Sequence, residues 1–139
     1  MSDPVRACLI IIGNEILSGR THDKNLPYLA EELNILGVRL AETRVIPDIE
    51  QTIINTVNEC RAAFDYVFTT GGIGPTHDDI TSECVAKAFG VPIELNADAH
   101  ALLKSHYENP EDLNAARLRM AHVPVGAELI DNPISKAPG

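Results

Sequence analysis

The sequence predicts a three-layer α/β/α domain built around a mostly parallel, doubly wound sheet. Apolar segments typical of buried strands alternate with segments whose apolar residues recur at helical spacing, in the order β-α-β-α-β-loop-α. The chain has 139 residues, of which 45% are hydrophobic, enough for one core and too few for two independent domains. We therefore expect residues 1–139 to form a single domain.

Two strands and the helix between them are expected in the first part of the chain. Residues 7–12 form a continuous apolar run rich in β-branched side chains, which is typical of a strand buried on both faces of a parallel sheet. Asp23 can cap the helix whose apolar residues recur between residues 26 and 36. Residues 38–45 alternate apolar and polar side chains, which predicts a strand covered on one face.

The next three elements are expected on similar grounds. Asp48 and Gln51 have the spacing of a capping box, at the start of a helix whose apolar stripe runs from residue 49 to residue 64. Residues 66–70 are typical of a strand that leads directly into a glycine-rich turn. Residues 80–89 then form a helix that ends at a glycine.

Two successive helices are expected in the last part of the chain. The first covers residues 97–108 with Asn96 as its cap, and the second covers residues 111–121. A last strand is expected near residues 127–130. The chain then stops abruptly on Ala-Pro-Gly, which indicates that the domain is truncated at its C-terminal end.

The net charge of the chain disfavours two classes of binding partner. Twenty acidic and eleven basic side chains give a formal net charge of -9, which repels nucleic-acid phosphates and anionic lipid, so neither nucleic acid nor membrane is an expected partner. No apolar run is long enough for a signal peptide or a membrane span. The three cysteines (Cys8, Cys60 and Cys84) are odd in number and lack metal-ligand spacing, which favours reduced core thiols and a cytoplasmic protein.

The glycine-rich turn after the third expected strand is the strongest functional candidate. Gly71, Gly72 and Gly74 permit positive φ and let backbone amides converge on an anion, and the next helix start adds free amides. Thr70 and Thr76 can add hydroxyl donors. The segment lacks the lysine of the P-loop and the spacing of the dinucleotide fingerprint. The alternative is a turn that only reverses the chain.

Two carboxylates, Asp78 and Asp79, follow this turn at once. Each charge pair between a carboxylate and a phosphate 4 Å away is repulsive by about 1 kcal/mol in water and about 4 kcal/mol near a protein surface. A divalent cation that bridges the two groups reverses the sign, and oxygen ligands suit magnesium or manganese. We therefore predict a cation site at Asp79, helped by Asp78. The alternative is that both aspartates complement the helix dipole, with His77 as polar surface.

Polar side chains also follow the other expected strands, at the same edge of the sheet. Glu15 could be a cation ligand or a base, and Asp48 could hold its carboxylate toward a ligand while it caps a helix. Lys136 would supply positive charge to a phosphate, unless it belongs to a solvated tail. Three further residues could reach an anion or could serve only in turns and caps: Ser18, Arg20 and Asn25.

Residues 70–81 resemble the signature of the MoaB/Mog-type domain of molybdenum-cofactor biosynthesis proteins. Four further segments look more like the CinA-related branch, named after competence/damage-inducible proteins: residues 13–20, 23–25, 45–48 and 132–139. That branch is also similar to the amino-terminal domain of some eukaryotic FAD synthases. The resemblance implies the α/β/α fold, with the ligand at the carboxyl ends of the strands.

The resemblance also implies chemistry. Mog-type members bind molybdopterin and transfer an adenylyl group to it with magnesium, and their two functionally important aspartates match Asp48 and Asp79 by motif position. The resemblance to CinA-type members implies metal-dependent cleavage of a nucleoside diphosphate sugar, usually ADP-ribose. Mog-type proteins often carry basic residues where this chain has His77 and Asp78, which favours a metal-centred diphosphate site. The family domain also normally continues past Ala-Pro-Gly.

We therefore expect a pyrophosphatase of the ADP-ribose type that uses magnesium, with manganese or cobalt as alternatives. Two other functions stay open: adenylyl transfer to molybdopterin, and a binding module that holds molybdopterin or a nucleotide without catalysis. Relatives of this fold are commonly oligomeric, so by analogy we expect a homo-oligomer.

Overall fold

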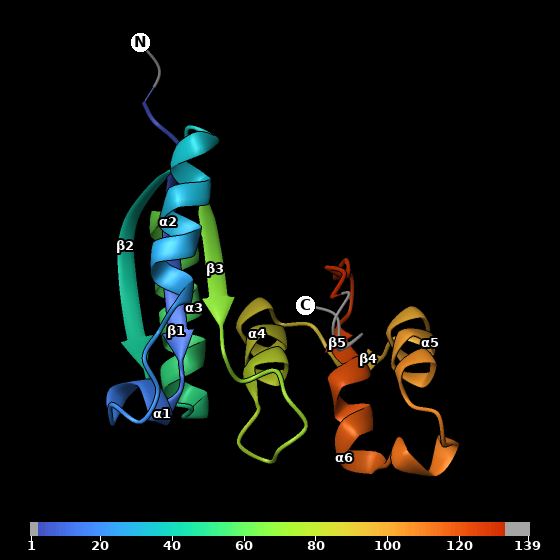
Figure 1. The fold of residues 1–139 in the computed structure, drawn as a ribbon. Helices are drawn as coiled ribbons and strands as arrows, with labels where there is room; N and C mark the ends of the chain where they lie inside the picture. Colours follow the sequence, from blue (N-terminus) through green and yellow to red (C-terminus); the bar gives the residue numbers. More distant parts are fainter. Residues whose placement is uncertain (1–2, 133–139) are drawn as a thin grey trace. The chain divides into compact units, whose positions relative to one another are not determined.

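The structure, a computed structural model, describes residues 3–132 in two units that meet in the sequence between Gly71 and Gly72. Within the described part of the first unit, three parallel strands form one sheet (Figure 1): β1 (Arg6–Ile12), β2 (Arg39–Ile46) and β3 (Tyr66–Thr70). The strand order is β2-β1-β3, so the chain crosses over twice and winds in both directions from β1. The predicted parallel, doubly wound sheet is confirmed.

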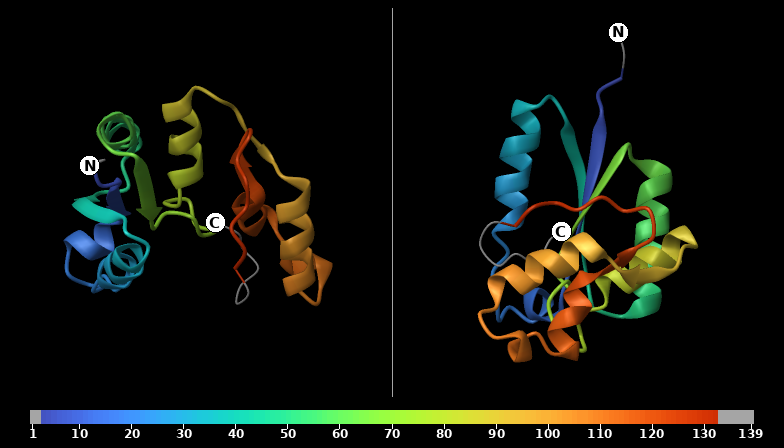
Figure 2. Two further views of the ribbon diagram at one scale, coloured as in Figure 1. Left: turned by 90° about the horizontal axis from the view of Figure 1, so that it is seen from above. Right: turned by 90° about the vertical axis from the view of Figure 1, so that its right-hand side faces the viewer.

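Helices cover both faces of this sheet, as the third layer of the predicted fold requires. α2 (Asn25–Ile35) and α3 (Glu50–Ala63) lie on opposite faces (Figures 1 and 2), and the short α1 (Asn14–Leu17) follows β1. β1 is the middle strand, so its side chains meet a helix layer on either side. Residues 7–12 are at most 3% exposed, which explains why their sequence is apolar without alternation.

The second unit has its own elements. It begins with α4 (Thr81–Phe89), followed by β4 (Ile93–Leu95) and α5 (Ala97–His106). β4 pairs antiparallel with β5 (His122–Pro124) in a sheet that has two strands among the described residues. Three fully buried residues of this unit pack together: Ala99, Leu103 and Ala121.

Two predictions for the second unit were wrong. The helix expected at residues 111–121 is divided into a 3-10 turn η1 (Pro110–Asp112), α6 (Ala115–Leu118) and a 3-10 turn η2 (Arg119–Ala121). Asn114 causes the division, because its side chain accepts a hydrogen bond from the backbone N–H of Arg117 (2.9 Å) and caps a new helix. The strand expected near residues 127–130 is absent there, and the chain pairs earlier, at β5.

The predicted helix caps had different outcomes. Asp23 accepts hydrogen bonds from the backbone N–H groups of Asn25 (3.3 Å) and Leu26 (2.9 Å), and so it caps α2 as expected. The capping box at Asp48 and Gln51 was wrong. α3 begins at Glu50, and its N-cap residue is Ile49, whose apolar side chain makes no capping hydrogen bond. The carboxylate of Asp48 is thereby left for a contact at the sheet edge.

The described residues contain no helix that is both long and apolar enough to cross a membrane. All three cysteines are buried and free, so their predicted place in the core is confirmed. Lys136 lies outside the described residues, as does most of the segment 132–139 that carries part of the family resemblance.

Candidate functional site

The glycine turn needs its glycines because other groups come very close to it. Gly71 has φ +90°, and a Cβ on it would lie 2.0 Å from the carbonyl oxygen of Ile12, at the end of β1. Gly72 has φ +71°, and a Cβ there would lie 2.1 Å from Oγ1 of Thr81, at the start of α4. Neither position can accept a side chain without a shift of the backbone or of Thr81. The turn therefore brings the backbone of Gly71 against the end of β1 and that of Gly72 against the side chain of Thr81.

Residues 76–79 form a small hydrogen-bonded loop that already holds an oxyanion. The backbone N–H and the hydroxyl of Thr76 both donate to Oδ2 of Asp79, at 2.9 and 2.7 Å. The backbone N–H of Asp79 donates in return to the carbonyl of Thr76 at 3.1 Å. A Cβ on Gly74 would lie 2.8 Å from the same Oδ2, so this glycine makes room for the carboxylate. Of the donors predicted to bind a phosphate, those of Thr76 converge here on a carboxylate oxygen.

This geometry limits how Asp79 could act on a cation. With Oδ2 engaged by Thr76, Asp79 would use its other oxygen or turn out of the loop. Magnesium is commonly held by one or two carboxylates together with water and substrate phosphate, so a single aspartate at this position fits such a cation. The predicted metal role of Asp79 stays a prediction.

Asp78 has a different environment from its neighbour. Its Oδ1 lies 3.2 Å from Nε2 of His77, and the two side chains are 67% and 92% exposed. An ion pair between groups this exposed contributes little to stability. The carboxylate of Asp78 therefore faces His77 and solvent, and the loop hydrogen bonds of Thr76 go to Asp79 instead.

Arg119 holds the loop and was not among the candidates from the sequence. Its Nη1 donates to the carbonyl of Thr76 (2.8 Å) and its Nη2 to the carbonyl of Asp79 (3.1 Å). Nη2 also lies 3.3 Å from a carboxylate oxygen of Glu83 in α4. One guanidinium thus fixes both ends of the loop at residues 76–79. The sequence has no local pattern that links an arginine in η2 to a loop about 40 residues earlier.

In the first unit, the carboxyl ends of β1 and β2 bring polar groups together, as predicted. The backbone N–H of Gly13 donates to the carbonyl of Ile46 (3.0 Å), and this bond joins the two strand ends. Just beyond it, Nδ2 of Asn14 donates to Oδ1 of Asp48 at 2.6 Å. The carboxylate of Glu15 folds back over Gly13, where an added Cβ would lie 2.4 Å from its Oε1. The Asn14–Asp48 contact was not anticipated.

The remaining candidates of the first unit are exposed and make local contacts. The hydroxyl of Ser18 donates to the carbonyl of Glu15 (3.3 Å), and Nε of Arg20 donates to that hydroxyl oxygen (3.2 Å). Asn25 is the first residue of α2, and its backbone N–H donates to the carboxylate of Asp23. These contacts are those of a turn and a cap, and a ligand contact for Ser18, Arg20 or Asn25 stays a prediction.

Thr70 presents an unsatisfied polar atom at the end of β3. Its Oγ1 is buried and has no hydrogen-bond partner among the residues that the structure describes. Buried hydroxyls nearly always have a partner, so an orphaned one calls for a water, an ion or a ligand. Thr70 was proposed from the sequence as a hydroxyl donor at this strand end, and its position is consistent with that role.

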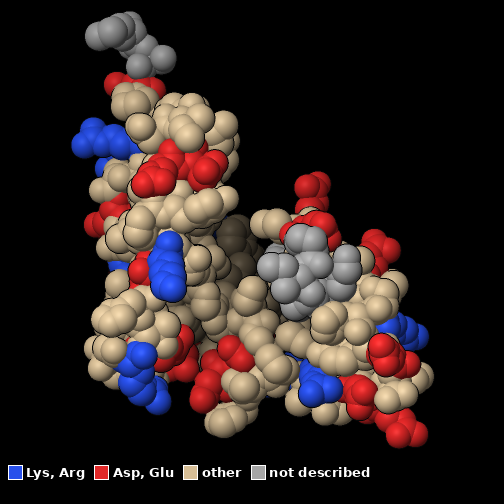
Figure 3. Space-filling model, viewed as in Figure 1, with Lys and Arg blue, Asp and Glu red and all other residues tan. Residues whose placement is uncertain are grey.

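Acidic side chains are spread over the face of the molecule drawn in Figure 3, with lysines and arginines between them. On that face no broad basic surface gathers over the described residues of either unit. The absence of nucleic-acid partners stays a prediction.

Comparison with known proteins gives a consistent family. The family described as "Probable molybdopterin binding domain" matches residues 8–139. A CinA-like protein from Myxococcus xanthus is 38% identical over 96% of this chain and 32% of its own length. The crystal structure of a CinA protein of unknown function from Thermoplasma acidophilum is 36% identical, with a TM-score of 0.91 over 99% of this chain and 81% of that one.

More distant structures share the fold alone. A molybdopterin biosynthesis Mog protein from Mycobacterium ulcerans is similar with a TM-score of 0.57 and 20% identity, over 95% of this chain and 87% of that one. The chain spans about half the length of several curated relatives that it matches, and about a third of CinA-like ones. The family match, the CinA-like relatives and the glycine turn agree, and the chain belongs to the MoaB/Mog-type molybdopterin-binding domain family, in its CinA-like branch.

Proposed function

We propose that this domain binds a nucleotide or pterin that carries a phosphate or diphosphate, together with a divalent cation, and that it hydrolyses a nucleoside diphosphate sugar such as ADP-ribose. One observation carries the proposal. The N–H and the hydroxyl of Thr76 converge on a single oxyanion, the Oδ2 of Asp79, in a loop that Arg119 holds at both ends. Donors placed for a carboxylate oxygen are also placed for a phosphate oxygen.

The start of α4 supports the same ligand class. α4 has nine residues and begins at Thr81, two residues after the loop, and its N-cap residue Ile80 has no side chain that caps it. The backbone N–H of Thr81 donates to the carbonyl of Gly72 (3.0 Å). The first amides of α4 and its positive dipole end favour an anion. In the proposal, the phosphate takes the Thr76 donors and Asp79 turns its carboxylate to the cation. The exchange replaces one anion on these donors by another, so the hydrogen bonds of the loop are kept.

The reaction needs a water and a group that accepts its proton. When bound, a divalent cation would stabilise the negative charge that develops on the bridging oxygen. The base is proposed to be Asp48 or Glu15, the two carboxylates at the carboxyl ends of the first-unit strands. The hydrogen bond from Asn14 holds one oxygen of Asp48, so the other oxygen is the one that would face water.

The family match favours a second candidate, in which molybdopterin is the ligand. The N–H and the hydroxyl of Thr76 would bind it too, because molybdopterin also presents a phosphate. The chemistry would then be adenylyl transfer, or binding without a reaction. The exposed pair of His77 and Asp78 adds no fixed positive charge at the loop, and this favours the first candidate, a diphosphate whose charge is balanced by a bound cation.

A product assay separates the three functions. The full-length protein is incubated with ADP-ribose, or with ATP and molybdopterin, in the presence of magnesium, manganese or cobalt. AMP and ribose 5-phosphate from ADP-ribose support hydrolysis, and adenylylated pterin supports transfer. Saturable binding with neither product supports the binding module, and the hydrolase proposal then fails.

A pair of variants tests the cation role of Asp79. Asp79→Asn keeps the shape of the side chain but loses the charge, so turnover should fall by two orders of magnitude or more while the fold is kept. Asp78→Asn is the matched control, because it removes the neighbouring exposed charge and should leave turnover within a few-fold. Unchanged turnover in Asp79→Asn would remove this residue from the mechanism.

A further inference from the structure

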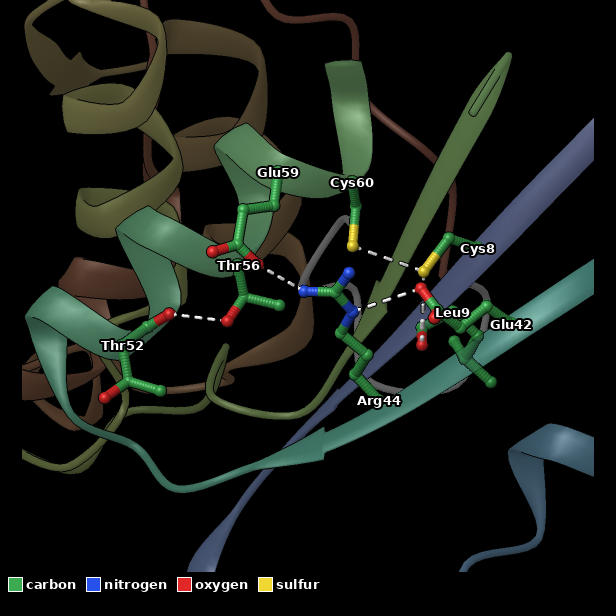
Figure 4. Close-up of polar contacts among 8 residues, drawn as sticks. All are labelled: Cys8, Leu9, Glu42, Arg44, Thr52, Thr56, Glu59 and Cys60. Carbon is green, nitrogen blue, oxygen red and sulfur yellow. Dashed lines mark hydrogen bonds and ion pairs between the residues drawn. The ribbon is translucent and has the colours of Figure 1, made fainter. Parts of the chain in front are cut away.

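Two cysteines that are distant in the sequence lie side by side in the core of the first unit. Sγ of Cys8, in β1, is 3.3 Å from Sγ of Cys60, in α3. A carboxylate oxygen of Glu42, in β2, completes a group of three atoms that all lie within 4.8 Å of one another. Figure 4 shows the two sulfur atoms directed at each other, with Glu42 and Arg44 beside them. Three elements thus converge on one point.

The strand register explains how this group forms. β1 and β2 pair in parallel, but the register shifts between Ala7 and Cys8, so that Cys8 lies opposite Glu42 and not opposite Ala41. Such an irregularity re-aims side chains locally. Both thiols are 0% exposed, whereas the side chain of Glu42 is 43% exposed. The group therefore has a buried sulfur half and a carboxylate that reaches the solvent.

The charges around the thiols suit a divalent cation. Arg44 pairs with Glu42 (3.1 Å) and also with Glu59, so the ion pair beside the sulfurs belongs to a group with two negative charges and one positive charge. If one divalent cation replaces two thiol protons, the formal charge of the group does not change.

We propose that Cys8, Cys60 and Glu42 form a binding site for a thiophilic divalent cation such as Zn²⁺. On binding, two S–H bonds break, two metal–sulfur bonds form, and both protons pass to solvent. Tetrahedral Zn²⁺ with Zn–S bonds of about 2.3 Å separates its two sulfurs by about 3.8 Å, so the thiols need to move apart by only about 0.5 Å. Glu42 is the third ligand, and water takes the fourth position.

This site differs in chemistry from the cation proposed for Asp79. Thiolates select Zn²⁺ and other soft ions, whereas a site made of carboxylate, water and phosphate oxygens suits Mg²⁺. The ion would enter from the side of Glu42 and Arg44, whose side chains are 43% and 32% exposed. Their ion pair is partly solvated and therefore weak enough to open. The proposal does not depend on the proposed function.

Cobalt is the test probe, because Co²⁺ bound to thiolate gives a charge-transfer absorption band that Co²⁺ bound only to oxygen lacks. The full chain is reduced, stripped of metal with a chelator, and titrated with Co²⁺ and then with Zn²⁺. We expect a thiolate band that saturates at one equivalent of Co²⁺ and disappears on addition of one equivalent of Zn²⁺. Cys8→Ser and Cys60→Ser should each abolish it.

Two further variants control for folding. Cys84→Ser removes the third buried cysteine, which lies in α4 of the second unit, and should keep the full band. Glu42→Gln changes an exposed residue and should fold normally, and we expect it to weaken Zn²⁺ binding at least tenfold, since even outer-shell partners contribute 10- to 100-fold.

The proposal is overturned if folded, reduced wild-type protein gives no thiolate band, or if the band survives in Cys8→Ser or Cys60→Ser. It is equally overturned if Glu42→Gln binds Zn²⁺ as tightly as wild type, because the third ligand would then be wrong. Asp79→Asn should keep the band, so failure of this site and failure of the proposed hydrolysis can be told apart.

Discussion

Gly71→Ala is the substitution for which the structure predicts the sharpest stability effect. Gly71 follows the last residue of β3 and is the first residue of the glycine turn, with φ +90°. An alanine Cβ would lie 2.0 Å from the carbonyl oxygen of Ile12 and 3.1 Å from its carbonyl carbon. Because those atoms belong to the backbone at the end of the central strand, no side-chain rotation can relieve the contact.

The cost has two parts, and a second glycine isolates one of them. A left-handed φ costs a non-glycine residue about 1–2 kcal/mol. Overpacking in a well-packed region costs about 1–3 kcal/mol more, so we expect Gly71→Ala to lower the free energy of unfolding by about 2–5 kcal/mol. Gly37 is the matched control, because its φ is +78° and a Cβ there would meet nothing within 4 Å. Gly37→Ala should cost only the first part.

Urea unfolding of the two variants and the wild type measures both costs. The m-values should agree, which shows that the same transition is compared, and the midpoint of Gly71→Ala should be well below that of Gly37→Ala. If the two variants lost equal free energy of unfolding, the close approach of Gly71 to the carbonyl of Ile12 would be refuted. A loss confined to Gly37→Ala would refute it more strongly.

Two further predictions concern the second unit. Arg119→Lys should lose the two-pronged contact with the loop at residues 76–79 and lower the free energy of unfolding by about 1–2 kcal/mol, with faster hydrogen exchange of the loop amides. Arg117→Lys is its control, because Arg117 contacts Asp112 and Tyr107 instead, and equal exchange in both variants would contradict the role of Arg119. Asn96→Ala should destabilise the protein by about 1 kcal/mol, whereas Asn96→Asp, which can still cap α5, should cost less in the same urea titration.

The parts of the fold that depend on neighbours in sequence were predictable. The continuous apolar run of β1 indicated a strand with both faces covered, and β3 has the predicted bounds, Tyr66–Thr70. The cap at Asp23 followed from its place just before an apolar helical stripe. Each of these signals acts within a few residues, where periodicity and side-chain chemistry decide the conformation.

The parts that depend on distant partners were not predictable. β4 and β5 have three residues each, too few for a period, and their pairing with each other defines them. Asp48 was assigned to a helix cap on local spacing, but Asn14, 34 residues earlier, takes its carboxylate. Cys8 lies opposite Glu42 because of a register shift that no pattern of residue types indicates, and Cys60, 52 residues after Cys8, reaches the same place from α3.

The candidate site was likewise predictable only in part. The glycines and Asp79 were identified because a turn of this composition after a strand is unusual, and the structure places Asp79 in the loop. No pattern of residue types indicated that Thr76 and Asp79 bond to each other, or that Arg119 binds their carbonyls. A loop that closes on its own carboxylate must open for an anion, and that step is the central claim of the proposed function.

Amide chemical shifts during a titration with ADP-ribose, with and without Mg²⁺, test this claim most directly. If the phosphate replaces the Asp79 carboxylate on the Thr76 donors, the amides of Gly72, Gly74 and Thr76 should shift together in a saturable manner. The apparent affinity should fall at least tenfold when Mg²⁺ is removed, because the repulsion from Asp79 then returns. Saturable binding that leaves these amides unmoved, or that is indifferent to the cation, would contradict the claim.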